Sequence, residues 1–287
     1  MKTILVPVDF SPVSRKQAEY AAFLAQKLNA EILLCNVISD NVYIGISGTG
    51  DVLGSDPLHN MKMIQNSEDY SHEKLIVLQK ELSQCYSEIK WKIKTLRGDA
   101  VYELLRQIEK YLPTLVLMGM NKTEEGTSAS GSVIIDIVKK SVVPVWVYLD
   151  KESTDHEFRK VVYTTDFMHP DKEIIEDLLA FLKPFSVKLY CVHICLDGNY
   201  LRAFSRMSDL KAYFKNEYLE EKIVFDVLEE RKAGIAINNF IQQNQIDLIS
   251  YVPTSKNMFE RLFRNRLSRK HIIETKLPIL AWKVRDE

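Results

Sequence analysis

The same succession of strand-like and helix-like segments occurs twice in this chain, and this internal duplication limits the possible fold more than any other feature. Short matching segments recur at an offset of 157 residues early in each copy and of 133 or 134 later. The matching pairs are Asp9-Phe10 with Asp166-Phe167, Asn36-Val37 with His193-Ile194, Ala100 with Ala233, Ile108 with Ile241, and Pro144 with Pro278. Two such copies in 287 residues indicate two domains of ordinary size.

Each copy alternates short apolar strands with amphipathic helices. In the first copy, strands over 2–8 and 31–37 flank a helix whose inner face is rich in alanine. Connections this short require parallel strands and a right-handed crossover. Segment 89–95 alternates apolar residues with lysines, which predicts a strand at the edge of the sheet with one face in water. The sequence therefore predicts an α/β fold with parallel sheets.

The stretch from Leu115 to Tyr148 contains a candidate nucleotide site. An apolar strand ends at Gly119, where we expect a turn, and a polar loop then leads to Gly131-Ser132 and a short helix. Pro144 ends that helix, and a second apolar strand follows. Free backbone N–H groups at the start of such a helix suit a phosphate. However, glycines also occupy such turns in folds that bind nothing, and neither GxGxxG nor GxxxxGK[ST] is present.

Composition excludes several classes of partner. A formal net charge of −1 gives no reason to expect nucleic acid or a membrane surface. No apolar run reaches the length of a membrane span, and the N-terminus lacks the layout of a signal peptide, so we expect a cytoplasmic protein. The four cysteines form neither a zinc-binding spacing nor a disulfide framework. Cys35, Cys191 and Cys195 lie in apolar strand-like segments, which indicates reduced thiols in the core.

The duplication also predicts domain boundaries. We expect a first domain over residues 1–150, a polar linker over 151–158 and a second domain over 159–287. The first copy is about 24 residues longer, largely because of a segment rich in glycine, serine and threonine between Gly45 and Gly54. This segment is either a flexible loop without a role or a lid over the ends of the strands.

With the two copies side by side, the sequence resembles the universal stress protein family in its tandem two-domain form. The resemblance is carried by ILVPVDFS around Asp9, by Asn36-Val37, by Gly98-Asp99 and by residues 115–148, and it covers nearly the whole chain. It implies two Rossmann-like domains of the adenine nucleotide alpha hydrolase-like kind, each a five-stranded parallel sheet flanked by helices. In ATP-binding members, a glycine is followed by two residues, a second glycine, nine residues, a third glycine and a small hydroxyl residue.

This resemblance implies a site for ATP or another adenine nucleotide, with or without Mg²⁺, in the first domain. Gly119 matches the first glycine and Gly131-Ser132 the last pair, but Lys122 replaces the second glycine and the loop is one residue shorter. Lys122 could contact a phosphate or fill the space that the ribose needs. The residues expected to contact the nucleotide are Pro7, Asp9, Val37, Met118, Gly119, Lys122, Ser128, Gly131, Ser132 and Val133.

The family resemblance also implies a role for most of these residues. Asp9 would bind the ribose or adenine region, and the backbone of Val37 would meet the adenine edge. Gly119 would let the ribose approach, and the start of the helix at Gly131 would hold the phosphates. In the second domain the corresponding residues are Val252, Pro253 and Asn265-Arg266, which leave no room for a ribose and no glycine for phosphate, so we expect that site to be degenerate.

Three functions remain open from the sequence. The first is a nucleotide-binding stress-response regulator that acts through an unknown protein partner. The second is an interaction or dimerisation module that binds no nucleotide. The third is a slow ATPase with Asp9 and Glu124 or Glu125 near Mg²⁺ and no catalytic base that we can identify. We also expect the last strands of the two domains, 145–148 and 279–282, to pack as an intramolecular pseudo-dimer, with a further homodimer left open.

Overall fold

The computed structural model contains two compact units. It describes residues 2–39, 57–120, 129–149, 156–196, 198–215, 222–230, 232–253 and 277–283. One unit consists almost entirely of residues before Pro144, and the other of Pro144 and the residues after it. The predicted boundary at residue 150 stays a prediction, as does the role of the Gly45–Gly54 segment, which lies outside the described residues.

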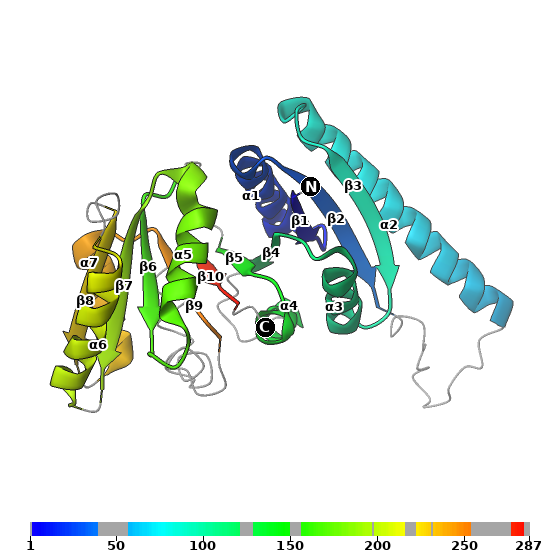
Figure 1. Cartoon of the computed structure of the whole chain (residues 1–287). Coiled ribbons are helices and arrows are strands. Elements are labelled where there is room, and N and C mark those ends of the chain that lie inside the picture. Colours follow the sequence, from blue (N-terminus) through cyan, green and yellow to red (C-terminus); the bar gives the residue numbers. More distant parts are fainter. Residues whose placement is uncertain are drawn as a thin grey trace. The chain divides into compact units, whose positions relative to one another are not determined.

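The first unit is a parallel sheet covered by helices on both faces (Figure 1). Its strands are β1 (Lys2–Pro7), β2 (Ala30–Ile38), β3 (Trp91–Arg97) and β4 (Leu115–Met120), in the spatial order β3-β2-β1-β4. The helices are α1 (Pro12–Leu28), α2 (Pro57–Cys85), α3 (Ala100–Tyr111) and α4 (Ala129–Lys140). Ser71 of α2 donates a hydrogen bond to Asn36 of β2. Gln107 of α3 accepts one from Lys94 of β3, which pairs with Cys35, the residue before Asn36. Since successive strand residues point to opposite faces, α2 and α3 cover opposite faces of the sheet.

Helix starts in this unit follow the capping signals in the sequence. Ser11 caps α1, because its hydroxyl accepts a hydrogen bond from the Ser14 N–H at 3.2 Å, and Pro12 occupies the first turn. Asp99 caps α3 in the same way through the Tyr102 N–H at 2.9 Å. Serine and aspartate are among the residues that favour this capping position. α2 likewise begins at Pro57, and proline is well suited to a first helical position.

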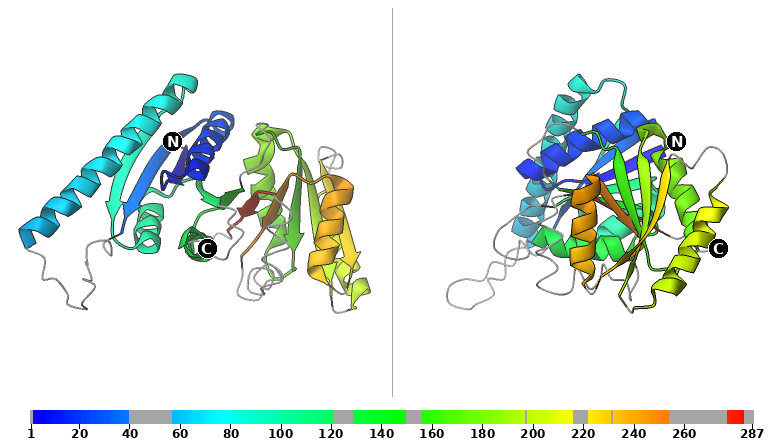
Figure 2. Two further views of the ribbon diagram at one scale, coloured as in Figure 1. Left: turned by 180° about the vertical axis from the view of Figure 1, so that it is seen from behind. Right: turned by 90° about the vertical axis from the view of Figure 1, so that its left-hand side faces the viewer.

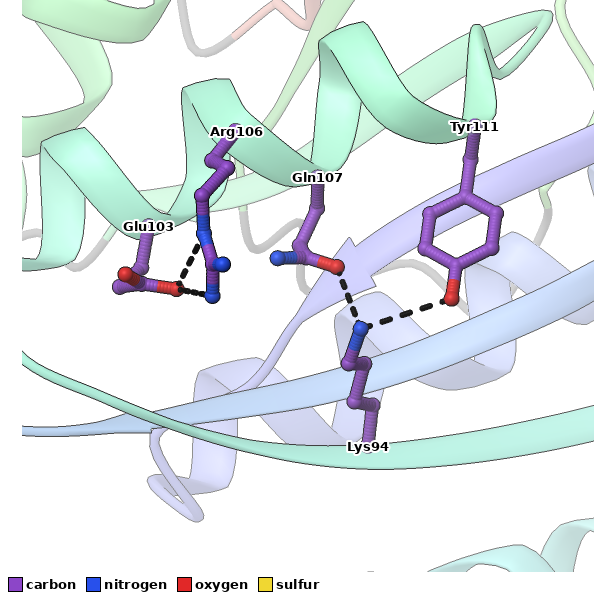
Figure 3. Close-up of polar contacts among 5 residues, drawn as sticks. All are labelled: Lys94, Glu103, Arg106, Gln107 and Tyr111. Carbon is purple, nitrogen blue, oxygen red and sulfur yellow. Dashed lines mark hydrogen bonds and ion pairs between the residues drawn. The ribbon is translucent and has the colours of Figure 1, made fainter.

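The predicted edge strand with lysines is also confirmed. β3 forms one edge of the first unit's sheet. Its Lys92 bonds the buried carboxylate of Glu31, and this hydrogen bond lowers the pKa of Glu31. Figure 3 shows the Lys94 ammonium between Gln107 Oε1, at 2.7 Å, and the Tyr111 hydroxyl, at 3.4 Å. The lysines therefore tie the edge strand to its neighbours as well as giving it charge.

The second unit has the same doubly wound plan (Figure 2). Its strands are β5 (Val145–Leu149), β6 (Lys160–Thr165), β7 (Lys188–Cys195), β8 (Ile223–Glu229), β9 (Leu248–Tyr251) and β10 (Ile279–Ala281), in the spatial order β5-β10-β9-β6-β7-β8. Its helices are α5 (Asp171–Leu182), α6 (Tyr200–Tyr213) and α7 (Ala233–Asn244), with the 3-10 turn η2 (Lys183–Phe185). The predicted α/β fold with largely parallel strands is confirmed.

The last strands of the two copies lie together within this unit. β10 runs parallel to β9 and antiparallel to β5, with Leu280 opposite Trp146. This pairing covers an apolar strand whose edge would otherwise be exposed. It agrees with the expected contact between 145–148 and 279–282, while the wider pseudo-dimer and any homodimer stay predictions.

Candidate functional site

The strand order of the first unit places a topological switch point between β1 and β4. From β1 the chain passes through α1 to β2 on one side, whereas β4 lies on the other side. Open α/β sheets bind ligands at such a point, outside the carboxyl ends of the strands. Pro7 ends β1, and Met118 and Gly119 lie near the end of β4. These three residues lie at or near the carboxyl ends of β1 and β4, and their contact with a nucleotide stays a prediction.

Asp9 follows β1 and is exposed at this edge. Its carboxylate accepts the Ser11 N–H at 3.0 Å, and the intervening Phe10 has a positive φ of 61°. Partial burial raises the pKa of Asp9, but hydrogen bonds from the side chain and backbone of Ser11 outweigh it, so the pKa lies below its ordinary value. A charged acceptor is thus held by a strained turn beside the switch point.

The end of β2 is held beside this turn. The Asn36 side chain donates to the Val8 carbonyl at 2.7 Å and accepts the Ser71 hydroxyl of α2 at 2.8 Å. Val37, the residue expected to meet adenine, pairs in register with Leu96 of β3 and is half-buried. Its contact with a nucleotide stays a prediction.

The turn predicted at Gly119 is wrong, because β4 continues through this residue to Met120. A Cβ built on Gly119 would lie 2.7 Å from Gln17 Oε1 and 3.3 Å from Gln17 Cβ. A glycine is required here since the buried Gln17 side chain of α1 packs against its Cα. Whether a ribose also approaches Gly119 stays a prediction.

Gly131, in contrast to Gly119, has no described side chain packed against it. It lies in the first turn of α4, where the backbone N–H groups have no carbonyl acceptor within the helix. None of the described atoms lies within 4 Å of the position that its Cβ would take. Ser132 is exposed and Val133 half-buried in the same helix. Lys122 and Ser128, also expected at the phosphates, lie outside the described residues.

The second unit repeats the turns of the first at its own strand ends. The Asp166 carboxylate accepts the Met168 N–H at 3.0 Å, and Phe167 has a φ of 57°. His193 Nδ1 lies 2.9 Å from the Thr165 carbonyl, which matches the bond from Asn36 to Val8. The duplication inferred from the sequence therefore extends to individual hydrogen bonds.

Near β6 and β9, however, the second unit carries different, buried side chains. Ile174 and Val252, which correspond to Gln17 and Gly119, are 2% and 5% exposed. Asp171 is buried as well, and its carboxylate accepts hydroxyl hydrogen bonds from Tyr163 at 2.8 Å and Thr165 at 2.7 Å. The corresponding first-unit residues are Ser14, Val6 and Val8. Sequence reasoning missed this polar cluster, whose one signal was a Tyr-Thr-Thr run in an otherwise apolar strand.

Asp171 provides a prediction of pH dependence. Burial raises the pKa of its carboxyl above the ordinary value, although the hydrogen bonds from Thr165 and Tyr163 oppose the shift. The stabilisation from the protonated form is complete below the unfolded-state pKa of about 4 and is lost as pH rises through the folded-state pKa. Asp171→Asn should therefore gain stability relative to the natural chain as pH rises from 4 to 7. Thermal midpoints measured across that range test this expectation, and a constant difference would contradict it.

Comparison with known proteins places the chain in a family. The model of the Universal stress protein family matches residues 1–148, just over half of the 287 residues. The chain belongs to this family. The resemblance read from the sequence is thereby confirmed.

Solved structures confirm the fold over the whole length. A universal stress protein from Archaeoglobus fulgidus DSM 4304 is 19% identical, with a TM-score of 0.69 over 98% of this chain and 96% of that one. A structure described as a putative universal stress protein from Pseudomonas aeruginosa UCBPP-PA14 is 11% identical, with a TM-score of 0.59 over 100% of this chain and 94% of the other. Comparison with curated proteins gives no match.

A universal stress protein solved in complex with cAMP is more distant. It is 15% identical and covers 52% of this chain, with a TM-score of 0.37. That likeness is too weak to indicate what this chain binds.

Two further findings concern the described residues alone. None of the helices there is long and apolar enough to cross a membrane. No group of three or more His, Cys, Asp or Glu side chains within the described ranges could hold a metal ion.

Proposed function

We propose that this universal stress protein binds ATP or a related adenine nucleotide in its first unit, at the carboxyl ends of β1, β2 and β4. Binding would change the shape of the chain or its affinity for a protein partner, as in a stress-response regulator. Turnover of the nucleotide would be slow or absent. Family membership supports the ligand class, and the switch point supports its place.

Each part of the nucleotide has residues suited to it. The exposed carboxylate of Asp9 is an acceptor for ribose hydroxyls or the adenine amine. The half-buried end of β2 at Val37 offers backbone groups to the adenine edge. The first turn of α4, with Gly131 and Ser132, offers N–H groups and a hydroxyl to the phosphates. If Mg²⁺ accompanies the phosphates, the carboxylate of Asp9, which follows β1, would be a ligand for it.

The observation that carries the proposal is the space at Gly131, which none of the described side chains fills. A glycine inside a helix costs about 1 kcal/mol relative to alanine. Here no described side chain occupies the space of the missing Cβ, and the residue is helical, so neither packing nor a positive φ requires glycine. A phosphate that closely approaches the backbone would explain why glycine occupies position 131.

Titration of the full chain with ATP tests the proposal. Calorimetry should give saturable binding with one site per chain. GTP serves as the matched control, because it carries the same phosphates on a different base and should bind more weakly. If ATP gave no measurable heat of binding to protein that circular dichroism shows to be folded, the proposal would be contradicted.

A second candidate is an interaction module that binds no nucleotide. The position of Gln17 favours it, because this side chain fills the space beside Gly119 that the family resemblance assigns to a ribose. The same ATP titration separates the two candidates.

A further inference from the structure

Gln17 bridges β1 and β4 near the switch point. Its side chain lies in α1 and is only 2% exposed. The amide Nε2 donates to the Pro7 carbonyl at 3.0 Å and to the Leu117 carbonyl. Both amide hydrogens are therefore used to join the two strand ends that flank the switch point. A side chain held by two hydrogen bonds, one of them buried, has little freedom to move.

The rest of the Gln17 side chain occupies the Cβ side of Gly119. Its Oε1, Cβ and Cδ lie 2.7, 3.3 and 3.3 Å from where a Gly119 Cβ would be. Glycine permits the close approach of another group to the backbone. In this chain the group that makes this approach is Gln17. A ligand can use the same space only where Gln17 is absent or displaced.

The two units close this place in different ways. In the second unit the corresponding residues, Ile174 and Val252, are buried apolar side chains. In the first unit the glycine is kept and one polar side chain fills the space, next to the small residues Ala18 and Ala21 of the same helix face. Replacing Gln17 alone would therefore empty the space beside Gly119 in the first unit and leave the second unit unchanged.

We infer that Gln17 is an affinity-determining residue that sets how deeply an adenine nucleotide can enter the first unit. It keeps the ribose out of the space beside Gly119 and so weakens binding. This inference rests on the proposed function for the place of the ligand. It assigns to Gln17 a role that nothing in the motif pattern of the sequence indicated.

Calorimetric titration of ATP into full-length Gln17→Ala tests the inference. Affinity should rise at least about tenfold over the natural chain, although loss of two hydrogen bonds lowers stability. A merely structural role predicts unchanged or weaker binding. Gln26→Ala is the matched control, because Gln26 lies on the exposed face of the same helix and should leave affinity unchanged.

The outcomes separate this inference from the proposed function. Binding by the natural chain without a gain in Gln17→Ala overturns the inference and leaves the proposed function standing. Binding by Gln17→Ala alone supports the inference and overturns the proposed function for the natural chain. No binding by either folded protein overturns both.

Stability measurements keep the inference testable even where Gln17→Ala folds poorly. Gly119→Ala should lower the thermal midpoint of the natural chain, because its Cβ meets Gln17. In the Gln17→Ala background the same change should be tolerated, and it should reverse the gain in ATP affinity by refilling the space. An equal loss of midpoint in both backgrounds would show that Gln17 does not fill this space, and would overturn the inference.

Discussion

Gly131→Val is expected to abolish adenine-nucleotide binding to the whole chain. The new side chain would stand over the first turn of α4, where no described atom lies within 4 Å of its Cβ, and would separate the phosphates from the backbone N–H groups. Loss of two charge-assisted hydrogen bonds, at roughly 1.5–3 kcal/mol each, weakens binding by at least about 100-fold. Calorimetry with ATP measures the change.

Gly131→Ala controls for folding in this experiment. Alanine should raise the stability of the ligand-free chain by about 0.5–1 kcal/mol, because it favours the helix and meets no described atom. It should nevertheless weaken ATP binding. A glycine without a ligand would give the gain in stability and no loss of binding, which would contradict the proposed site.

Asp9 and Asp166, at corresponding strand ends of the two units, form a matched pair that tests which unit binds the nucleotide. Asp9 and Asp166 accept equivalent backbone N–H groups, each at 3.0 Å, so substitution by alanine removes the same turn contact from either unit. Asp9→Ala should lose most of the ATP affinity, whereas Asp166→Ala should change it less than about twofold. Binding that survives Asp9→Ala and fails in Asp166→Ala would place the nucleotide in the second unit.

Trp146→Ala is expected to destabilise the second unit strongly. Trp146 lies in β5, is 0% exposed, and its ring centroid is 5.3 Å from that of Phe158. Phe158 in turn lies 4.8 Å from Phe185. Removal of a buried tryptophan leaves a cavity and costs about 3–5 kcal/mol. Guanidinium unfolding should show this loss in the transition of the second unit.

Tyr102→Ala is the matched aromatic control. Tyr102 is 65% exposed on α3, so its truncation should change stability by less than about 0.5 kcal/mol. Equal effects of the two substitutions would show that β5 is not part of a packed core.

The sequence predicted the frame of the molecule well, for identifiable reasons. The apolar strands over 2–8 and 31–37 are local signals, and they have the predicted counterparts in β1 and β2. The edge position of β3 followed from alternating lysines. These signals are readable because they depend on nearest neighbours in the chain.

The details of the site depend on contacts between distant segments, and the sequence did not show them. Gly119 was read as a turn, but its reason is Gln17, which lies about 100 residues earlier in the chain. Gln17 carried only a weak signal, namely its helical spacing with the buried Ser14 and Ala21.

Native mass spectrometry of gently purified full-length protein tests the central claim most directly, because it counts bound molecules per chain. The proposed function predicts one adenine nucleotide on each chain, bound in the first unit, and its loss from Asp9→Ala but not from Asp166→Ala. Two equivalent nucleotides per chain, or none after incubation with millimolar ATP, would contradict it.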